Sequence, residues 1–220
     1  MTVLLATLGF THQAVMPSLR WAKNLKKVVL FHSKNAKSKE AKEKIREGCK
    51  ALGVQFEPYE VKDEYALTSI IKEMNEELSR ISKEYRNEEI IFNITGGTKM
   101  LASAALIICI MKGIKAIYIR ETDGEILEVP LLRMKYSDVL TSAEKKTLRG
   151  IADICEENGS DEIRLSLIYE KHMRSDSVIS TYIKKLEKLG LVETFVKEDN
   201  RREKWLKFKD SAKLCLLGDE

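Results

Sequence analysis

Short apolar runs alternate with longer stretches of helical periodicity through the first 120 residues of the chain. Apolar residues at every third or fourth position predict amphipathic helices, and short β-branched runs predict strands. The predicted strands are residues 3–8, 27–31, 54–59, 90–94 and 116–120, and the longer stretches between them are residues 17–25, 38–52, 65–86 and 98–111. This alternation is typical of a doubly wound α/β fold with a largely parallel sheet.

The end of this first region carries two further signals. Residues 107–111 are apolar on nearly every side of their predicted helix. One face is expected to pack on the sheet and the other against a second structure, such as a dimer partner. Farther on, Asp123-Gly124 tolerates the positive φ of a hairpin turn. The chain is therefore expected to return as an edge strand at residues 126–130.

From residue 138 the pattern changes to three helical segments followed by two alternating runs. The helical segments are residues 142–157, 162–172 and 176–190, and the runs at 191–196 and 204–209 flank the polar residues 199–202. Three helices followed by a hairpin is the order of a winged helix-turn-helix. We therefore expect one domain at residues 1–137 and a second at 138–220, joined by a linker at 135–142.

Composition narrows the class of protein only modestly. The chain has 220 residues and a net charge of +4, a weak argument for a polyanionic partner, and Lys and Arg outnumber Asp and Glu by 5 over residues 1–137. The cysteines, Cys49, Cys109, Cys155 and Cys215, are too dispersed for a zinc site or a disulfide framework. They indicate buried thiols in a reducing cytoplasm, and residues 1–8 are too short for a signal peptide or a membrane span.

The segment Asn93-Ile94-Thr95-Gly96-Gly97-Thr98-Lys99 lies between a predicted buried strand and a predicted helix, where open α/β sheets bind ligands. Gly96 and Gly97 allow close backbone approach, Thr98 can cap the helix, and the helix start with Lys99 favours an anion. The spacing excludes a Walker A loop and a G-x-G-x-x-G dinucleotide loop. A tight strand-to-helix turn without a ligand explains the same residues.

A second loop, Leu8-Gly9-Phe10-Thr11-His12, follows the first predicted strand. If the first and fourth strands are neighbours, Gly9 and Thr11 lie on the same rim as Thr98 and Lys99 and can contact the same ligand. His12 is open to two interpretations, an exposed loop residue or a residue with a catalytic or ligand-binding role.

The Gly-Phe loop, the Asn-x-Thr-Gly-Gly-Thr-Lys turn and the carboxyl-terminal helices together resemble the CARF-domain proteins of CRISPR systems. More narrowly, the chain is similar to archaeal transcriptional regulators that join a Rossmann-like CARF domain to a winged helix-turn-helix. The resemblance implies a homodimer that holds a cyclic oligoadenylate, expected to be cyclic tetra-adenylate, across its two-fold axis as an allosteric ligand, with no cofactor. The residues expected to contact this ligand are Leu8, Gly9, Phe10, Thr11, Asn93, Thr95, Gly96, Gly97, Thr98 and Lys99.

In the second domain, the helix at residues 176–190 separates an apolar stripe from a face of early hydroxyls and later lysines. Such a face suits the major groove of double-stranded DNA, with Asp176 as the N-cap and Gly190 ending the helix. The residues predicted to contact DNA are Arg174, Ser175, Ser177, Ser180, Thr181, Lys184 and Lys185, with Arg201, Arg202 and Lys204 at the wing. A dimerisation or protein-docking module explains the same pattern.

Catalysis is not expected to be the main function. The R-x-x-x-x-H spacing of HEPN ribonucleases is absent, because Thr7, Lys27 and Leu167 precede the three histidines by five residues. Local spacing also predicts no metal site. Two alternatives to a regulator stay open: a ring nuclease that slowly cleaves its own ligand, with Thr11 and Lys99 as candidates, and a repressor that senses another nucleotide.

Overall fold

The computed structural model describes residues 1–131, 139–171, 175–197 and 200–217, without the side chains of residues 36, 37 and 200–202. The chain divides into two units, Met1–Met134 and Lys135–Glu220. Each unit has its own hydrophobic core and is described separately.

The N-terminal unit is built on a six-stranded sheet with the order β3-β2-β1-β4-β5-β6. Its strands are β1 (Thr2–Leu8), β2 (Leu25–His32), β3 (Gln55–Glu60), β4 (Glu89–Asn93), β5 (Lys115–Ile119) and β6 (Ile126–Glu128). The first five strands are parallel, and β6 pairs with β5 antiparallel. The largely parallel sheet and the antiparallel edge strand predicted from the sequence are therefore confirmed.

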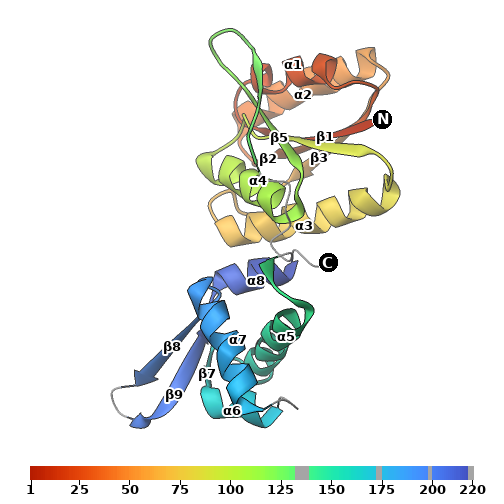
Figure 1. Ribbon diagram of the computed structural model, residues 1–220. Helices are drawn as coiled ribbons and strands as arrows, with labels where there is room; N and C mark the ends of the chain where they lie inside the picture. Colours follow the sequence, from red (N-terminus) through yellow and green to blue (C-terminus); the bar gives the residue numbers. More distant parts are fainter. Residues whose placement is uncertain (132–138, 172–174, 198–199, 218–220) are drawn as a thin grey trace. The chain divides into compact units, whose positions relative to one another are not determined.

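Helices cover both faces of this sheet (Figure 1). They are η1 (His12–Ala14), α1 (Met16–Trp21), α2 (Ala36–Ala51), α3 (Leu67–Glu84) and α4 (Lys99–Lys112). The short α1 and the long α2 lie on one side, and α3 and α4 lie side by side on the other.

The two-sided core follows from the alternation of side chains along β1, all of whose residues are buried. Leu4, Ala6 and Leu8 pack in one cluster with Ile45 and Cys49 of α2. The alternate residues of the strands point to the α3 and α4 side, where the Phe31 ring lies 5.8 Å from that of Phe92. Burial of the central strands on both faces of the parallel sheet explains why they contain apolar runs in the sequence.

The C-terminal unit contains four helices and a three-stranded antiparallel sheet with the order β7-β9-β8 within its described residues. Its elements are α5 (Ser142–Glu157), β7 (Glu162–Arg164), α6 (Leu165–Lys171), α7 (Asp176–Lys188), β8 (Val192–Lys197), β9 (Asn200–Phe208) and α8 (Asp210–Leu217). Side chains of α5, α7, β9 and α8 share one core.

Several details of this unit differ from the prediction. The expected helix at residues 162–172 begins with strand β7, because Ile163 pairs with Leu206 of β9. The segment predicted as linker contains Leu140, which is buried in the core. The helix α8, at residues 210–217, is not predicted by the sequence pattern at all.

The expected N-cap of α7 is also wrong. Ser175 occupies the cap position without a side-chain capping bond, and Asp176 is the first helical residue. The helix ends at Lys188, and Gly190 follows it with a φ of +71°. Gly190 therefore closes the helix in the left-handed conformation expected of a glycine at this position.

Candidate functional site

The strand order reverses between β1 and β4, which are paired in register from Thr2 with Glu89 to Ala6 with Asn93. From its carboxyl end, β1 leads to η1 and α1 on one face of the sheet, whereas β4 leads to α4 on the other. Ligands of open α/β sheets bind in the crevice at such a switch point. The neighbouring positions expected for the first and fourth strands are confirmed.

The loops that leave β1 and β4 touch through their backbones. A Cβ atom added to Gly9 would lie 2.9 Å from the backbone nitrogen of Gly97. A Cβ added to Gly96 would lie 2.3 Å from the carbonyl oxygen of Thr7. No side chain fits into contacts this short, so the glycines allow the two loops to form one continuous rim.

The helix α4 begins at this rim with the predicted cap. Thr98 is the N-cap, and its Oγ1 accepts a hydrogen bond of 3.2 Å from the amide of Leu101. Gly97, at φ +91°, makes the turn before it. The first turn contains no acidic residue, and Lys99 is exposed. Free helical amides, the helix dipole and a lysine together favour a negatively charged group.

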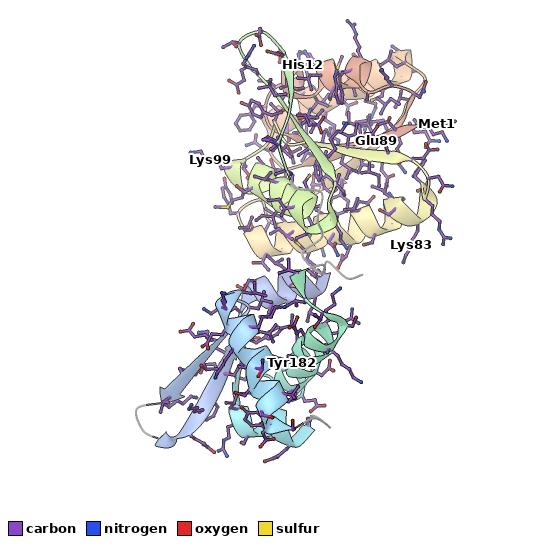
Figure 2. All side chains as sticks on the ribbon, in the orientation of Figure 1. Met1, His12, Lys83, Glu89, Lys99 and Tyr182 are labelled. Atoms are coloured by element: carbon purple, nitrogen blue, oxygen red, sulfur yellow. The ribbon has the colours of Figure 1, made fainter. Side chains whose placement is uncertain are left out.

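Lys99 marks the carboxyl edge of the parallel strands, on the opposite side of the unit from Met1 and Lys83 (Figure 2). This edge therefore collects the loops after β1 and β4 at the start of α4.

Asn93 is fully buried, and its amide group is saturated by the protein. Its Nδ2 donates to the carbonyl oxygen of Ala14 and to Oγ of Ser18, at 2.9 and 3.1 Å. Its Oδ1 accepts from the amide and the hydroxyl of Thr95. Asn93 thus ties the loop after β4 to η1 and α1 and has no polar atom left for a ligand.

Thr95 continues this network to the next strand, because its hydroxyl oxygen accepts a 2.7 Å hydrogen bond from the amide of Ile119 at the end of β5. Leu8, also predicted as a ligand contact, is completely buried in the core. The sequence-predicted residues therefore fall into two groups. Leu8, Asn93 and Gly96 are buried and hold the loops, while the others have at least partly accessible surface: Gly9, Phe10, Thr11, Thr95, Gly97, Thr98 and Lys99.

A third loop reaches the site, and sequence reasoning missed it. The hydroxyl of Thr98 donates to the carbonyl oxygen of Glu64 at 3.3 Å, so the loop before α3 adjoins the start of α4. The next residue, Tyr65, is 73% exposed, and Phe10 of the first loop is 59% exposed. Strand topology could have predicted this loop, because the loop after β3 leaves from the same edge of the parallel sheet as the loops after β1 and β4.

A cavity of about 510 Å³ opens beside the rim, between the start of α1 and the hairpin that joins β5 to β6. Thr11 and Thr95 contribute to its wall. A second hollow, of about 810 Å³, adjoins it along α1 and is lined by His12, among others. Ligand pockets in proteins typically have volumes of roughly 300–1,000 Å³.

His32 ends β2 at the same edge and pairs in register with Leu8. Its Nδ1 lies 2.9 Å from the carbonyl oxygen of Ser33, which requires Nδ1 to donate, and its Nε2 lies 3.5 Å from Nζ of Lys42. Burial, with a contribution from the nearby Lys42 charge, lowers the pKa of His32 below its usual 6.5. Burial thus favours the neutral form of the imidazole.

Among the residues that the structure describes, no three His, Cys, Asp or Glu side chains gather to hold a metal ion. In the same ranges, every helix is too short or too polar to cross a membrane. Burial raises the pKa of Cys109 to about 12, and its thiol is not poised to react.

In the C-terminal unit, the predicted DNA contacts on α7 lie mostly on its solvent face. Ser177, Thr181 and Lys184 are exposed, and Lys188, which the sequence reasoning missed, continues the same stripe one turn later. Ser175 is exposed at the cap position, and Ser180 is half-buried. Figure 2 marks the helix by Tyr182, which is half-buried in the unit.

Lys185 differs from its neighbours because its ammonium group pairs with the buried carboxylate of Glu144 at 2.8 Å. Lys204 is exposed on β9. Arg174 and the side chains of Arg201 and Arg202 lie outside the described residues. On the sheet of this unit, Nζ of Lys197 lies 3.7 Å from the centre of the Trp205 ring.

Comparison with solved structures found similarity to proteins of low sequence identity, among them the following three. Csm6 of Enterococcus italicus, bound to cyclic hexa-2′-fluoro-hexa-dAMP, is 13% identical with a TM-score of 0.50, over 86% of this chain and 54% of that one. VC1899 of Vibrio cholerae is 10% identical with a TM-score of 0.49, over 98% and 64%. Can2 of Sulfobacillus thermosulfidooxidans, in complex with cyclic tetra-adenylate, is 17% identical with a TM-score of 0.45, over 99% and 62%.

The chain thus spans less than two thirds of the length of each of these proteins. No curated protein matches it. Residues 2–130, more than half of the sequence, match the Csa3 CRISPR-associated Rossmann-like domain. The α/β, Rossmann-like prediction for the first domain is therefore confirmed, and the chain belongs to the family of the Csa3 CRISPR-associated Rossmann-like domain.

Proposed function

We propose that the N-terminal unit senses a cyclic oligoadenylate, and that the C-terminal unit is a winged helix-turn-helix through which the sensor controls DNA binding. The observation that carries the sensing role is the backbone contact of Gly9 with Gly97 beside the Thr98-capped start of α4. It makes two loops into one rim with the chemistry of an anion site.

The ligand class is proposed from family and fold. The family is CRISPR-associated, and Csm6, whose fold is similar, holds a cyclic hexanucleotide analogue. The excess of basic residues over residues 1–137 supports an anionic ligand. A cyclic tetra-adenylate has four phosphates arranged with two-fold symmetry, which suits two copies of the rim in a homodimer.

The proposed dimer surface lies on α4. Met100 and Ser103 are exposed on this helix, and Leu106, Ile107 and Ile110 are only half-buried. These residues recur at helical spacing and form one stripe that is apolar except for Ser103. An isologous pair of such stripes would bring two ligand rims to one axis.

The winged-helix assignment rests on the order α5, β7, α6, α7, β8, β9 and on the place of β9 between β7 and β8. We propose α7 as the recognition helix, because its solvent face offers hydroxyls early and lysines later. Short hydroxyls permit close approach to base edges, and the lysines reach phosphates.

The two activities are coupled only if the ligand binds two states of the dimer with different affinity, and the coupling is then reciprocal. The test of the sensing role is isothermal titration of the full chain with cyclic tetra-adenylate, cyclic hexa-adenylate, AMP and NAD. Saturable binding of a cyclic oligoadenylate at micromolar protein supports the proposal. Binding of only AMP or NAD would favour a repressor that senses another nucleotide.

DNA binding is tested on α7. We predict that Lys184→Ala lowers the affinity for duplex DNA and reduces the slope of log K against log salt by about 1, because one phosphate contact is lost. Fluorescence anisotropy at several salt concentrations measures both quantities. Lys146→Ala, an exposed lysine on α5, is the matched control. Equal slopes for both variants would move the DNA surface away from α7.

We propose that the chain acts by binding and not by catalysis. Prolonged incubation of cyclic tetra-adenylate with the protein, followed by chromatography, is expected to return the intact ring. Linear adenylates as products would establish the alternative, a ring nuclease, and Thr11→Ala and Lys99→Ala would then locate the activity.

A further inference from the structure

The cavity of about 510 Å³ beside the rim has a composition unlike that of the rim itself. It shares Thr11 and Thr95 with the candidate site, so a ligand seated on the rim can extend into it. Its other lining residues are Gln13, Ala14, Pro17, Ile119, Arg120, Glu121 and Gly124. Lys99 is not among them.

The one basic residue among these lining residues, Arg120, is occupied by carboxylates of its own hairpin. Its Nε donates to both carboxylate oxygens of Asp123, at 3.0 and 3.2 Å, and its Nη2 is paired with Asp123 and Glu125. These hydrogen bonds hold the guanidinium plane in place and offset its charge. Arg120 thereby offers a flat surface for stacking instead of a cation for a phosphate.

The remaining charge on the cavity wall is negative. Glu121 is an exposed acidic residue on this wall. A phosphate entering the cavity would meet this charge, whereas an exocyclic amine can donate a hydrogen bond to it. The wall therefore disfavours the anionic part of a nucleotide and accepts an amino-bearing ring.

Gln13 supplies the complementary polar group. It is exposed, it lines both this cavity and the adjoining hollow, and it belongs to the η1 turn that Asn93 fixes through Ala14. A side-chain amide donates and accepts at once, which matches the paired acceptor and amine donor on an adenine edge. Pro17, which is half-buried, provides apolar surface for one face of a ring.

We propose that this cavity is a base pocket in which Gln13 and Glu121 select adenine, while the rim at Gly97 to Lys99 holds the neighbouring phosphate. The inference rests on the proposed sensing function and assigns the recognition of the base to side chains outside the glycine loops. It makes Gln13 a specificity-determining residue.

The experiment compares the full chain with Gln13→Ala and Glu121→Gln in titrations of cyclic tetra-adenylate and cyclic tetra-inosinate. Inosinate carries a carbonyl oxygen where adenylate has its amine. We expect the native chain to prefer the adenylate ring by about tenfold or more, because the wrong base leaves polar groups unpaired. In Gln13→Ala, the dissociation constant for the adenylate ring rises by about tenfold, and the preference over inosinate collapses.

Gln55→Ala is the matched control, because Gln55 is the chain's second glutamine, is exposed, and begins β3 at the far edge of the sheet. It is expected to bind both rings as the native chain does. Thermal melting of Gln13→Ala should equal that of the native chain, since the side chain is exposed.

The outcomes separate the two proposals. No binding of either ring to the native chain overturns the sensing function, and AMP against IMP in the same variants then tests the base pocket alone. Native binding with an unchanged adenine preference in both Gln13→Ala and Glu121→Gln overturns the base pocket and leaves the sensing function standing. Equal affinity of the native chain for adenylate and inosinate also overturns it.

Discussion

Gly96 and Gly97 are neighbours in the sequence, yet each is required for a different physical reason. Gly97 has a positive φ of 91°, a conformation that side chains disfavour. Gly96 is limited by space, because an added Cβ would lie 2.3 Å from the carbonyl oxygen of Thr7. A glycine pair in the sequence shows that the backbone needs freedom, but only the structure shows which of the two reasons applies.

We predict that Gly96→Ala destabilises the chain by about 1–3 kcal/mol, since β1 and the loop after β4 must move apart to admit the methyl group. The same change should weaken ligand binding at the rim. Gly53→Ala is the control, because Gly53 has a φ of +68° but nothing within 4 Å of an added Cβ. It should cost about 1 kcal/mol and leave binding unchanged. Urea denaturation and ligand titration measure the two effects, and equal binding by both variants would contradict this account.

His32 predicts a pH dependence of stability. Its folded-state pKa lies below 6.5, so the unfolded chain takes up a proton first as the pH falls. The contribution to stability is fully present above pH 6.5 and decreases as the pH falls from there toward the folded-state pKa. Urea midpoints at pH 7.5, 6.5 and 5.5 should therefore decline less in His32→Gln than in the native chain. A parallel decline in both would contradict this prediction, and His12→Gln serves as the control at a half-exposed position.

At the scale of whole elements, the Glu144 carboxylate both caps α5 and links it to α7. The Glu144 carboxylate accepts a 2.8 Å hydrogen bond from the amide of Thr141, which completes a capping box, and it pairs with Lys185 of α7. Burial would raise the pKa of Glu144, but the hydrogen bonds from Lys185 and Thr141 outweigh it, and the pKa lies below its ordinary value. The carboxylate therefore stays charged and joins the two helices.

Glu144→Gln is predicted to cost about 1 kcal/mol, the usual scale for a helix cap, because the charge that attracts Lys185 and complements the helix dipole is lost. Thermal unfolding at neutral pH measures it. Glu156→Gln, an exposed glutamate near the other end of α5, should change stability little. If the two variants melt alike, the capping box and its lysine carry no stability.

The sequence predicted the elements of the N-terminal unit well because β1, β2, β4 and β5 each contain an apolar run and each long helix repeats its apolar face. The prediction failed where an element is too short to show a repeating pattern of apolar residues. The three residues of β7 are too few to show an alternation, and their place as a strand depends on Leu206 far along the chain. The sequence pattern singled out Asn93, but it did not show that Asn93 ties two loops together, because its hydrogen-bond partner Ala14 is 79 residues away.

At the scale of the whole molecule, the proposed homodimer can be tested directly. We predict that Ser103→Glu, which adds a charge to the exposed stripe of α4, weakens the proposed homodimer and the binding of cyclic tetra-adenylate together. Analytical ultracentrifugation and titration measure the two quantities. Gln55→Glu adds the same charge at the opposite edge of the sheet and should leave both unchanged. A dimer that persists in Ser103→Glu would place the interface elsewhere.

The position of β1 at the centre of the sheet affects how the nascent chain folds during translation. Its partner β2 follows at Leu25–His32, whereas its other partner, β4, begins only at Glu89. At the usual rate of 5–20 residues per second, the interval between the end of β1 and the start of β4 is roughly 4 to 16 seconds of translation. Throughout this interval, one side of a strand destined for complete burial has no neighbour. An unpaired strand edge is prone to aggregation, so the chain carries this risk at β1 until β4 has been made.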